Sequence, residues 1–483
     1  MVESKSDDGR EASTSWKVEL QGVELIPDEH KLSAPKDLFF VFFGSQMCFA
    51  IIILGSLPIV FGLGFWDAVG AITVGLLIGS LFFGLLAPFG MRTGTSASLA
   101  TATHFGLRGK AIGTLIATFT ALGCYALTVW TGGEAVAAGV ARLFGWEMSQ
   151  HMLALGAVAI CAMTIVAAIY GHAIIVATER MVSYGAAFVL AIVAITLLPN
   201  FQPQYAGGDY LLDSYWPTWF LAMTICAAIP VSYATWLNDY TRYLRPGTSS
   251  GKAMMAAGGG MFIGCWLSLT FAAGVMTMLA SPETPFVTGI IGLVTWWAAL
   301  LLALVGVIGS QPQGSLLLYG AGLGVQSLFP SLTRITATVV LSLFGLALVF
   351  GGIYVVDMLG MVAAFLVVDQ CVIAPWLAIH LVGYCFVMKG RYKPEDLFIP
   401  VSQGGGRYWY QRGWNPNAVV GWLVGVVAGL MFVNTAYFKG PLSDLVGGIS
   451  LDWIVAGAAG GLVYYVLERL SRRPVPTAFS PAG

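Results

Sequence analysis

Long apolar stretches recur along nearly the whole chain, and they constrain its fold more than any other feature of the sequence. A stretch of 18 or more apolar residues can cross a hydrocarbon core of about 30 Å as a helix. The chain has 483 residues, of which 57% are hydrophobic and only 10% charged, more apolar surface than a water-soluble core could bury. The sequence therefore predicts an all-α polytopic membrane protein.

We expect about 12 transmembrane helices from these stretches. They cover residues 37–64, 67–90, 110–142, 152–172, 180–199, 216–240, 252–280, 289–326, 334–351, 356–388, 416–436 and 450–468. Residues 1–36 are polar and lack an apolar signal region, which is typical of a disordered or surface-lying tail rather than of a cleaved leader. Residues 469–483 are expected to form a second tail.

The positions of the basic residues predict the orientation of these helices. Cytoplasmic loops of membrane proteins carry an excess of Lys and Arg. Of the 23 basic residues, all but Arg142 and Lys439 fall on the side that holds both termini. We therefore expect a multi-pass protein of the cell membrane with both termini in the cytoplasm.

Several classes of function lack support in the sequence. The seven cysteines form no CxxC pair and the chain has no His cluster, so we expect neither a disulfide framework nor a metal site, and no cofactor. A net charge of -1 without a basic stripe gives no support for nucleic-acid binding. No HExxH, GxSxG or clustered His and Asp set indicates an enzyme.

Two of the apolar stretches contain features that break helices. Gly44, Ser45 and Gln46 interrupt the first stretch, and Pro230 and Ser232 lie inside the sixth. Paired breaks are typical of secondary transporters built from two inverted repeats. The repeats would be residues 37–199 and 216–388, with 416–468 as an accessory pair of helices. A simple Pro kink and a Gly packing contact are the alternative reading.

Four strings in the predicted loops and helix ends carry a family resemblance. They are HFGLRGK at 104–110, WLNDYTRYLRP at 236–246, PWLAIHLVGYCFVMKGRY at 375–392 and GRYWYQRGWNPNAVVGWLVG at 406–425. In these strings the chain resembles the nucleobase:cation symporter family, class 1, in its cytosine and purine permease branch. The resemblance implies a five-plus-five inverted-repeat fold of the leucine-transporter type, and import of cytosine, purines, hydantoins or related rings with sodium or protons. Two departures, His380 and Gly383, stand where the branch usually has Asn and Asp, and they concern the inner gate.

A planar heterocycle needs a face to stack on and hydrogen-bonding groups around its edge. The resemblance puts Tyr125, in the string GCYALTVWTGGEA, at the aromatic stacking position. Val129 then stands where the family usually has Asn or Gln. Gln313 and Gly314 fall where the family carries its polar pair, which makes Gln313 the candidate for an edge hydrogen bond. The side chains of Tyr125 and Gln313 could instead serve only the packing of helices.

The remaining candidates for the substrate pocket lie at the two helix breaks. They are Ser45 and Gln46 in the first apolar stretch, and Pro230, Val231 and Ser232 in the sixth. Their side chains and unwound backbone would complete the pocket.

Three residues are candidates for cation coupling. A sodium site in this fold uses backbone carbonyls of the first helix and hydroxyls of the eighth, where Ser310 is the only hydroxyl in VGVIGSQPQ. Proton coupling needs a carboxyl group that can hold a proton, and Glu134 and Asp369 lie well inside apolar sequence. Either carboxyl group could instead be a structural, hydrogen-bonded one.

The sequence thus predicts a secondary active importer of a nucleobase or related small heterocycle by cation symport, with protons favoured over sodium. Its expected partners are that substrate, the coupling ion and membrane lipid. The alternatives are a symporter of another small nitrogenous substrate, such as allantoin, a hydantoin or a hydroxymethylpyrimidine, and a passive channel, which the composition alone does not separate from a transporter.

Overall fold

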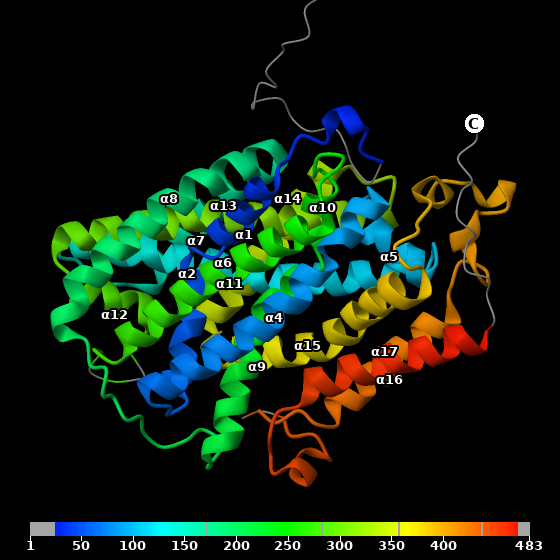
Figure 1. Ribbon diagram of the computed structural model, residues 1–483. Helices are drawn as coiled ribbons and strands as arrows, with labels where there is room; N and C mark the ends of the chain where they lie inside the picture. Colours follow the sequence, from blue (N-terminus) through cyan, green and yellow to red (C-terminus); the bar gives the residue numbers. More distant parts are fainter. Residues whose placement is uncertain are drawn as a thin grey trace, which may run out of the picture.

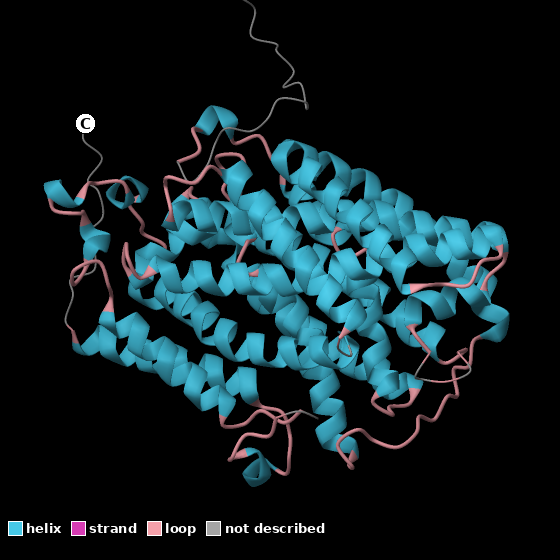
Figure 2. Ribbon diagram, turned by 180° about the vertical axis from the view of Figure 1, so that it is seen from behind, coloured by secondary structure: helices cyan, strands magenta, loops and turns pink. Residues whose placement is uncertain are grey.

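The computed structural model describes residues 25–170, 172–279, 281, 284–355, 358–435 and 438–471, and these residues form helices and loops without a strand (Figures 1 and 2). Seven of the helices in these ranges are long and apolar enough to cross a membrane, and a bent pair of shorter helices would make an eighth span. Large apolar side chains such as Leu77, Leu81 and Leu155 are more than half exposed, as expected for a surface that faces lipid. The structure is therefore that of a multi-pass α-helical membrane protein, whereas the number of 12 spans stays a prediction.

The helices follow the predicted stretches in order. The longer ones are α4 (Phe65–Thr93), α6 (Lys110–Phe144), α7 (Gln150–Tyr170), α8 (His172–Leu197), α9 (Tyr215–Tyr233), α11 (Ser250–Met276), α13 (Trp296–Leu328), α14 (Arg334–Tyr354), α15 (Met358–Val382), α16 (Pro416–Leu430) and α17 (Asp452–Leu470). The shorter ones are α1 (Pro35–Gly44), α2 (Phe49–Ile52), α3 (Leu57–Val60), α5 (Ala97–Phe105), α10 (Leu237–Thr241) and α12 (Phe286–Leu293). A π-helical turn, Gly383–Val387, extends α15.

The first predicted stretch is broken where its Gly and polar residues stand. α1 ends at Gly44, α2 begins at Phe49, and the two halves of the span meet at an angle of 68°. Pro58 lies in the first turn of α3, where its missing N–H costs no hydrogen bond. The prediction of a break at Gly44–Gln46 is confirmed.

The sixth stretch is also broken, but at a different residue from the one the sequence suggested. Pro230 lies inside α9, which continues to Tyr233, and the break covers residues 234–236 before α10 begins. Pro230 stays within the helix, and its ring packs toward Gly79 where α4 and α9 cross closely. The break therefore places Tyr233, rather than Pro230, at the free end of the helix.

The predicted span 289–326 is wrong as a single helix. The structure divides it into α12, which ends at Leu293, and α13, which begins at Trp296. Val294 and Thr295 have extended backbone between them. At about 1.5 Å per residue, α13 alone spans about 50 Å, so α12 is a separate short helix. The short helix α5, between α4 and α6, was not predicted either.

The packing of the helices has an internal symmetry that fits two repeats. The broken first span packs on α11, and α4 packs on both α9 and α11, while α6, α7, α13 and α14 form a second group. α8 packs on α1 and α13, whereas α15 packs on α9 and α6. If each of the first five spans is paired with the span five places later, every one of these contacts has a counterpart: the contact of α8 with α1, for example, corresponds to that of α15 with α9. Two inverted repeats would produce such a correspondence. The residue bounds of the two repeats stay a prediction.

Candidate functional site

Hydrogen bonds connect the break in the first span to α11. The Gln46 amide donates to Ser45 Oγ at 2.6 Å, and the Cys265 thiol donates to Gln46 Oε1 at 3.3 Å. Ser268 Oγ donates to the backbone carbonyl of Gln46 at 2.8 Å. Ser45 and Gln46 are both fully buried. The structure thus brings these two candidates together, and the Gln46 side chain is engaged by α11.

A buried carboxylate connects three helices beside this break. Asp369 of α15 accepts a hydrogen bond from Thr120 Oγ1 of α6 at 2.7 Å and one from Ser232 Oγ of α9 at 3.2 Å. Its side chain is 1% exposed, and among the described residues no Lys or Arg forms an ion pair with it. A carboxyl group held only by hydroxyls can gain or lose a proton without breaking an ion pair, because each hydroxyl can donate or accept. Of the sixth-span candidates, Ser232 is the one that meets a coupling candidate.

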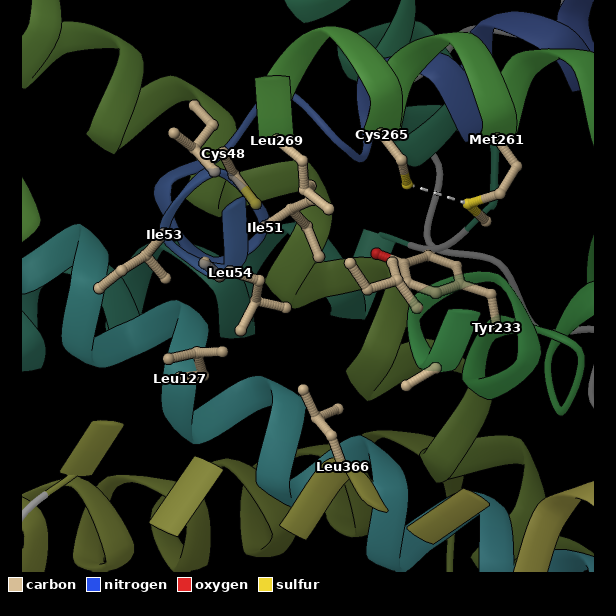
Figure 3. Close-up of a cluster of buried hydrophobic side chains, with 14 of the residues drawn as sticks. Cys48, Ile51, Ile53, Leu54, Leu127, Tyr233, Met261, Cys265, Leu269 and Leu366 are labelled. Carbon is tan, nitrogen blue, oxygen red and sulfur yellow. Dashed lines mark hydrogen bonds between the residues drawn. The ribbon is translucent and has the colours of Figure 1, made fainter. Parts of the chain in front are cut away.

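A second polar pair joins α9 to α13. The Tyr233 hydroxyl donates to Gln313 Oε1, and both side chains are buried. In Figure 3, the Tyr233 side chain extends into the space between the helices, on the side where Cys265 of α11 lies. Leu127 of α6 and Leu366 of α15 lie across that space. A tyrosine in this position offers a ring face, and Gln313 offers an amide, to a planar ligand. The sequence analysis proposed Gln313 but not its hydrogen-bond partner Tyr233.

Tyr125, the predicted stacking residue, lies on another face of α6. Its hydroxyl is 2.8 Å from Thr164 Oγ1 of α7, and its ring is covered by two glycines. A Cβ added at Gly314 would lie 3.3 Å from the ring, and one added at Gly345 would lie 2.5 Å from it. Tyr125 and Gly314 are thus in contact with each other within the group formed by α6, α7, α13 and α14. The stacking role of Tyr125 stays a prediction.

The face of α6 that carries Thr120 is the one that meets Asp369. Residues four and seven positions further along a helix share its face, so Cys124 and Leu127 lie on the same side as Thr120. Tyr125 is one residue further than Cys124, about 100° around the helix. A search for the α6 hydroxyl best placed to meet Asp369 would have identified this face.

The other two coupling candidates lie elsewhere. Ser310 Oγ donates to the carbonyl of Gly306 in its own helix at 2.6 Å. Its neighbour Gly309 makes the close approach to Met47 and Cys48, where a side chain would collide with the backbone of the broken span. The backbone of α13 at Gly309 therefore lies next to the first span, whereas the Ser310 hydroxyl lies toward Gly132 of α6.

Glu134 lies further along α6, away from Thr120 and Asp369. It is 14 residues beyond Thr120, a rise of about 21 Å along the helix. Glu134 Oε1 accepts hydrogen bonds from the Thr288 hydroxyl at 2.8 Å and from the Thr288 backbone N–H at 3.3 Å. The carboxylate thus holds the first turn of α12, whose N–H groups have no partner within the helix. Glu134 and Asp369 do not form one site.

His380 and Gly383, which depart from the family pattern, both contact His104. His380 and His104 have ring centroids 5.3 Å apart, and both side chains are fully buried. A Cβ added at Gly383 would collide with the His104 ring. His104 is also held by the hydroxyls of Tyr392, at 3.0 Å from Nε2, and Tyr464, at 3.3 Å from Nδ1. This cluster ties α5 to α15 and α17.

The fold agrees with that of solved transporters. Over 93% of this chain and 95% of the other, it superposes with a TM-score of 0.73 and 18% identity on Mhp1, described as a nucleobase-cation-symport-1 family transporter in a closed conformation with bromovinylhydantoin bound. The inward-facing conformation of Mhp1 gives the same TM-score at 17% identity, covering 94% of this chain and 95% of the other. A Na+-coupled sialic acid symporter gives a TM-score of 0.59 at 11% identity, covering 92% and 91%. These similarities confirm the all-α fold of the leucine-transporter type.

Sequence comparison gives the family. The chain is 25% identical over 470 residues to the putative purine-cytosine permease YxlA of Bacillus subtilis (strain 168), covering 95% of this chain and 98% of that protein. Residues 25–456 match the family described as permease for cytosine/purines, uracil, thiamine, allantoin. That match covers most of the chain, and a permease moves its substrate without converting it. The protein therefore belongs to this permease family and is a membrane transporter, not an enzyme.

Proposed function

We propose that the protein imports a nucleobase or a closely related heterocycle across the cell membrane, driven by symport of a cation, with protons favoured over sodium. The observation that carries this proposal is the contact of Asp369 with Thr120 and Ser232, next to the pair formed by Tyr233 and Gln313. Ser232 and Tyr233 are consecutive residues of α9. A proton on Asp369 and a ring against Tyr233 would therefore act on the same helix end.

The proposed pocket takes its edge contacts from several helices. Gln313 supplies an amide, and Ser45 and Gln46 supply polar groups of the broken first span. Tyr233 is the first choice for the stacking ring because it points into the middle of the helices. Tyr125 is the second. A site of buried polar groups rejects a ring that leaves them without partners, which gives the discrimination a permease needs.

Proton coupling is favoured over sodium coupling by the donor groups available. Sodium requires several hard oxygen ligands, and the hydroxyl of Ser310, the candidate in α13, donates to Gly306 in its own helix instead. Asp369 already has two hydroxyl partners that can form hydrogen bonds with both its protonated and its ionised form. Glu134 is the second candidate for the coupling group. The excess of basic residues on one side supports an orientation with both termini in the cytoplasm.

A competition assay tests this function. Uptake of radiolabelled cytosine would be measured in cells that lack their own nucleobase permeases, with unlabelled purines, uracil, hydantoin, allantoin and a pyrimidine alcohol as competitors, and with sodium and pH varied separately. We expect saturable uptake that a protonophore abolishes and that removal of sodium leaves unchanged. Saturable uptake that follows sodium would overturn the proton assignment. Uptake that neither saturates nor responds to any gradient would instead indicate a passive channel.

A further inference from the structure

The loop between α15 and α16 is a folded, basic segment that the transport site does not use. This basic loop, residues 389–415, contains five basic and two acidic residues. In Figure 1 it is drawn in orange and projects beyond the helices at the end where residues 25–33 also lie. By the proposed orientation, on which this inference rests, that end faces the cytoplasm. The basic loop thus lies where the cytoplasmic leaflet presents its headgroups.

The basic loop is held in place by the neighbouring helices. The Tyr410 hydroxyl donates to the Thr103 carbonyl of α5 at 2.6 Å, and the Arg108 N–H donates to the Gly413 carbonyl at 2.8 Å. The Arg108 guanidinium lies 5.4 Å from the centre of the Trp409 ring. Because these contacts fix the backbone, the side chains of the loop have a defined position relative to the membrane helices.

A pocket of about 400 Å³ opens within the basic loop. Its lining consists of Gly404, Gly406, Arg407, Trp409, Tyr410 and Gln411. Gly404 and Gly406 have φ of 98° and 62°, a backbone conformation that favours glycine; the Cβ position of Gly404 is open space, whereas that of Gly406 is filled by Asp396. The lining thus combines a guanidinium, an amide and two aromatic rings around exposed backbone.

Four of the five basic residues of the loop lack an ion pair among the described residues, although Asp396 lies beside Gly406 at the edge of the pocket. Lys389, Arg391, Arg407 and Arg412 form no ion pair with any described residue. Guanidinium groups bind phosphate oxygens through paired N–H donors, so Arg407 in the pocket lining matches a phosphate group. Four basic residues within one loop next to a membrane helix are also the pattern that attracts anionic lipids.

Exposed apolar side chains on the same loop indicate a lipid rather than a soluble phosphate. Phe398, Val401 and Trp414 are 42%, 57% and 38% exposed. Aromatic and apolar residues next to basic ones are favoured at the boundary between headgroups and acyl chains. A free phosphate or nucleotide would leave these side chains in water, whereas a phospholipid would cover them.

From these observations we propose that the basic loop binds the phosphate of an anionic phospholipid of the cytoplasmic leaflet in the pocket beside Arg407. The phosphate lies against Arg407 and Gln411, with the Trp409 ring beside the glycerol backbone. Arg412 adds a further positive charge next to the pocket. Because the basic loop contacts α5 and directly follows α15, a bound lipid stabilises the cytoplasmic ends of these helices.

Native mass spectrometry of the purified full-length protein tests this site. The protein would be titrated in detergent with short-chain phosphatidylglycerol, short-chain phosphatidylcholine and inorganic phosphate. We expect retention of phosphatidylglycerol and no retention of phosphatidylcholine at the same concentration. The variant Arg407→Gln with Arg412→Gln should weaken retention by about 30-fold, since each basic residue near an anionic surface contributes about a fivefold factor. Lys252→Gln is the matched control, because Lys252 is also exposed and on the same side of the membrane.

Three outcomes would overturn the proposal. They are equal retention of the two lipids, equal loss in the Lys252 control and the double variant, or displacement of phosphatidylglycerol by inorganic phosphate alone at equal concentration. The double variant removes only exposed or half-buried side chains, so it should fold. Lipid retention is measured without transport, so a failure of the proposed uptake activity would leave this test valid.

Discussion

The substitution Asp369→Asn tests the coupling mechanism most directly. Asparagine has nearly the same shape as aspartate and can keep one hydrogen bond to Thr120 or Ser232, but its amide cannot take up or release a proton. Weakening the contacts of one buried carboxylate costs about 1–3 kcal/mol, well below a typical folding stability of about 5–15 kcal/mol. We therefore expect the variant to fold and to bind substrate.

The magnitude follows from the energy stored in a proton gradient. A pH difference of one unit corresponds to about 1.4 kcal/mol per proton, so symport of one proton supports about tenfold accumulation of substrate. In proteoliposomes with the membrane potential clamped to zero and an acidic exterior, the unsubstituted protein should reach that ratio. Asp369→Asn should reach a ratio of about one, because substrate then equilibrates without a driving ion.

The matched control is Asp452→Asn. Asp452 is a fully buried carboxyl group too, but it lies in α17 and accepts hydrogen bonds from Ser450 Oγ at 2.8 Å and from the thiol of Cys371, which is two residues and about 200° around α15 from Asp369. That variant should keep tenfold accumulation. Persistence of gradient-driven accumulation in Asp369→Asn would refute the assignment of Asp369 as the coupling group, and loss in both variants would point to a general effect of buried amides on the fold.

Three further predictions concern single side chains. Tyr233→Phe should raise the KM about tenfold at unchanged membrane expression, because the glutamine amide of α13 loses a buried partner worth about 1–3 kcal/mol; an unchanged KM together with a raised one in Tyr125→Phe would move the substrate to the other ring. Gly383→Ala should lower the free energy of unfolding by about 1–3 kcal/mol, because its Cβ would collide with the His104 ring. A melting temperature equal to that of the unsubstituted protein would contradict this packing. Glu134→Gln should keep proton-driven accumulation but loosen α12, which faster labelling of an engineered cysteine on that helix would report; loss of accumulation would instead make Glu134 the coupling group.

The elements with distinctive residues were predicted from the sequence. The break in the first span was predicted because Gly44 and Gln46 interrupt an apolar stretch. A polar residue inside a membrane segment is costly, so its presence indicates a special local structure. The division between α12 and α13 was missed because Val294 and Thr295 are ordinary membrane residues without Gly or Pro. Hydropathy measures how apolar a segment is, and it contains no signal for a turn between two apolar helices.

The candidate site could be predicted in part for a related reason. Asp369, Ser232 and Gln313 were found because a polar group inside a membrane segment is costly, and all three take part in the central contacts. The ring was assigned to Tyr125 by its place in a family string, but a helix buried on most of its circumference shows no periodicity that fixes its rotation. One residue corresponds to about 100° of rotation, so the sequence alone does not decide whether Tyr125 or Cys124 faces Asp369, and the stacking role of Tyr125 stays a prediction.

The departures from the family pattern at the C-terminal end of α15 show how the structure changes the meaning of a substitution. As single positions, His380 and Gly383 suggest two independent changes in the inner gate. In the structure His104 contacts both, since its ring lies edge to face with His380 at 83° and fills the space that a side chain at Gly383 would need. The volume that is missing at Gly383 is thus supplied by His104 from α5. Because the three positions exchange volume within one packed cluster, the family residue at position 383 could be restored only together with a smaller residue at position 104.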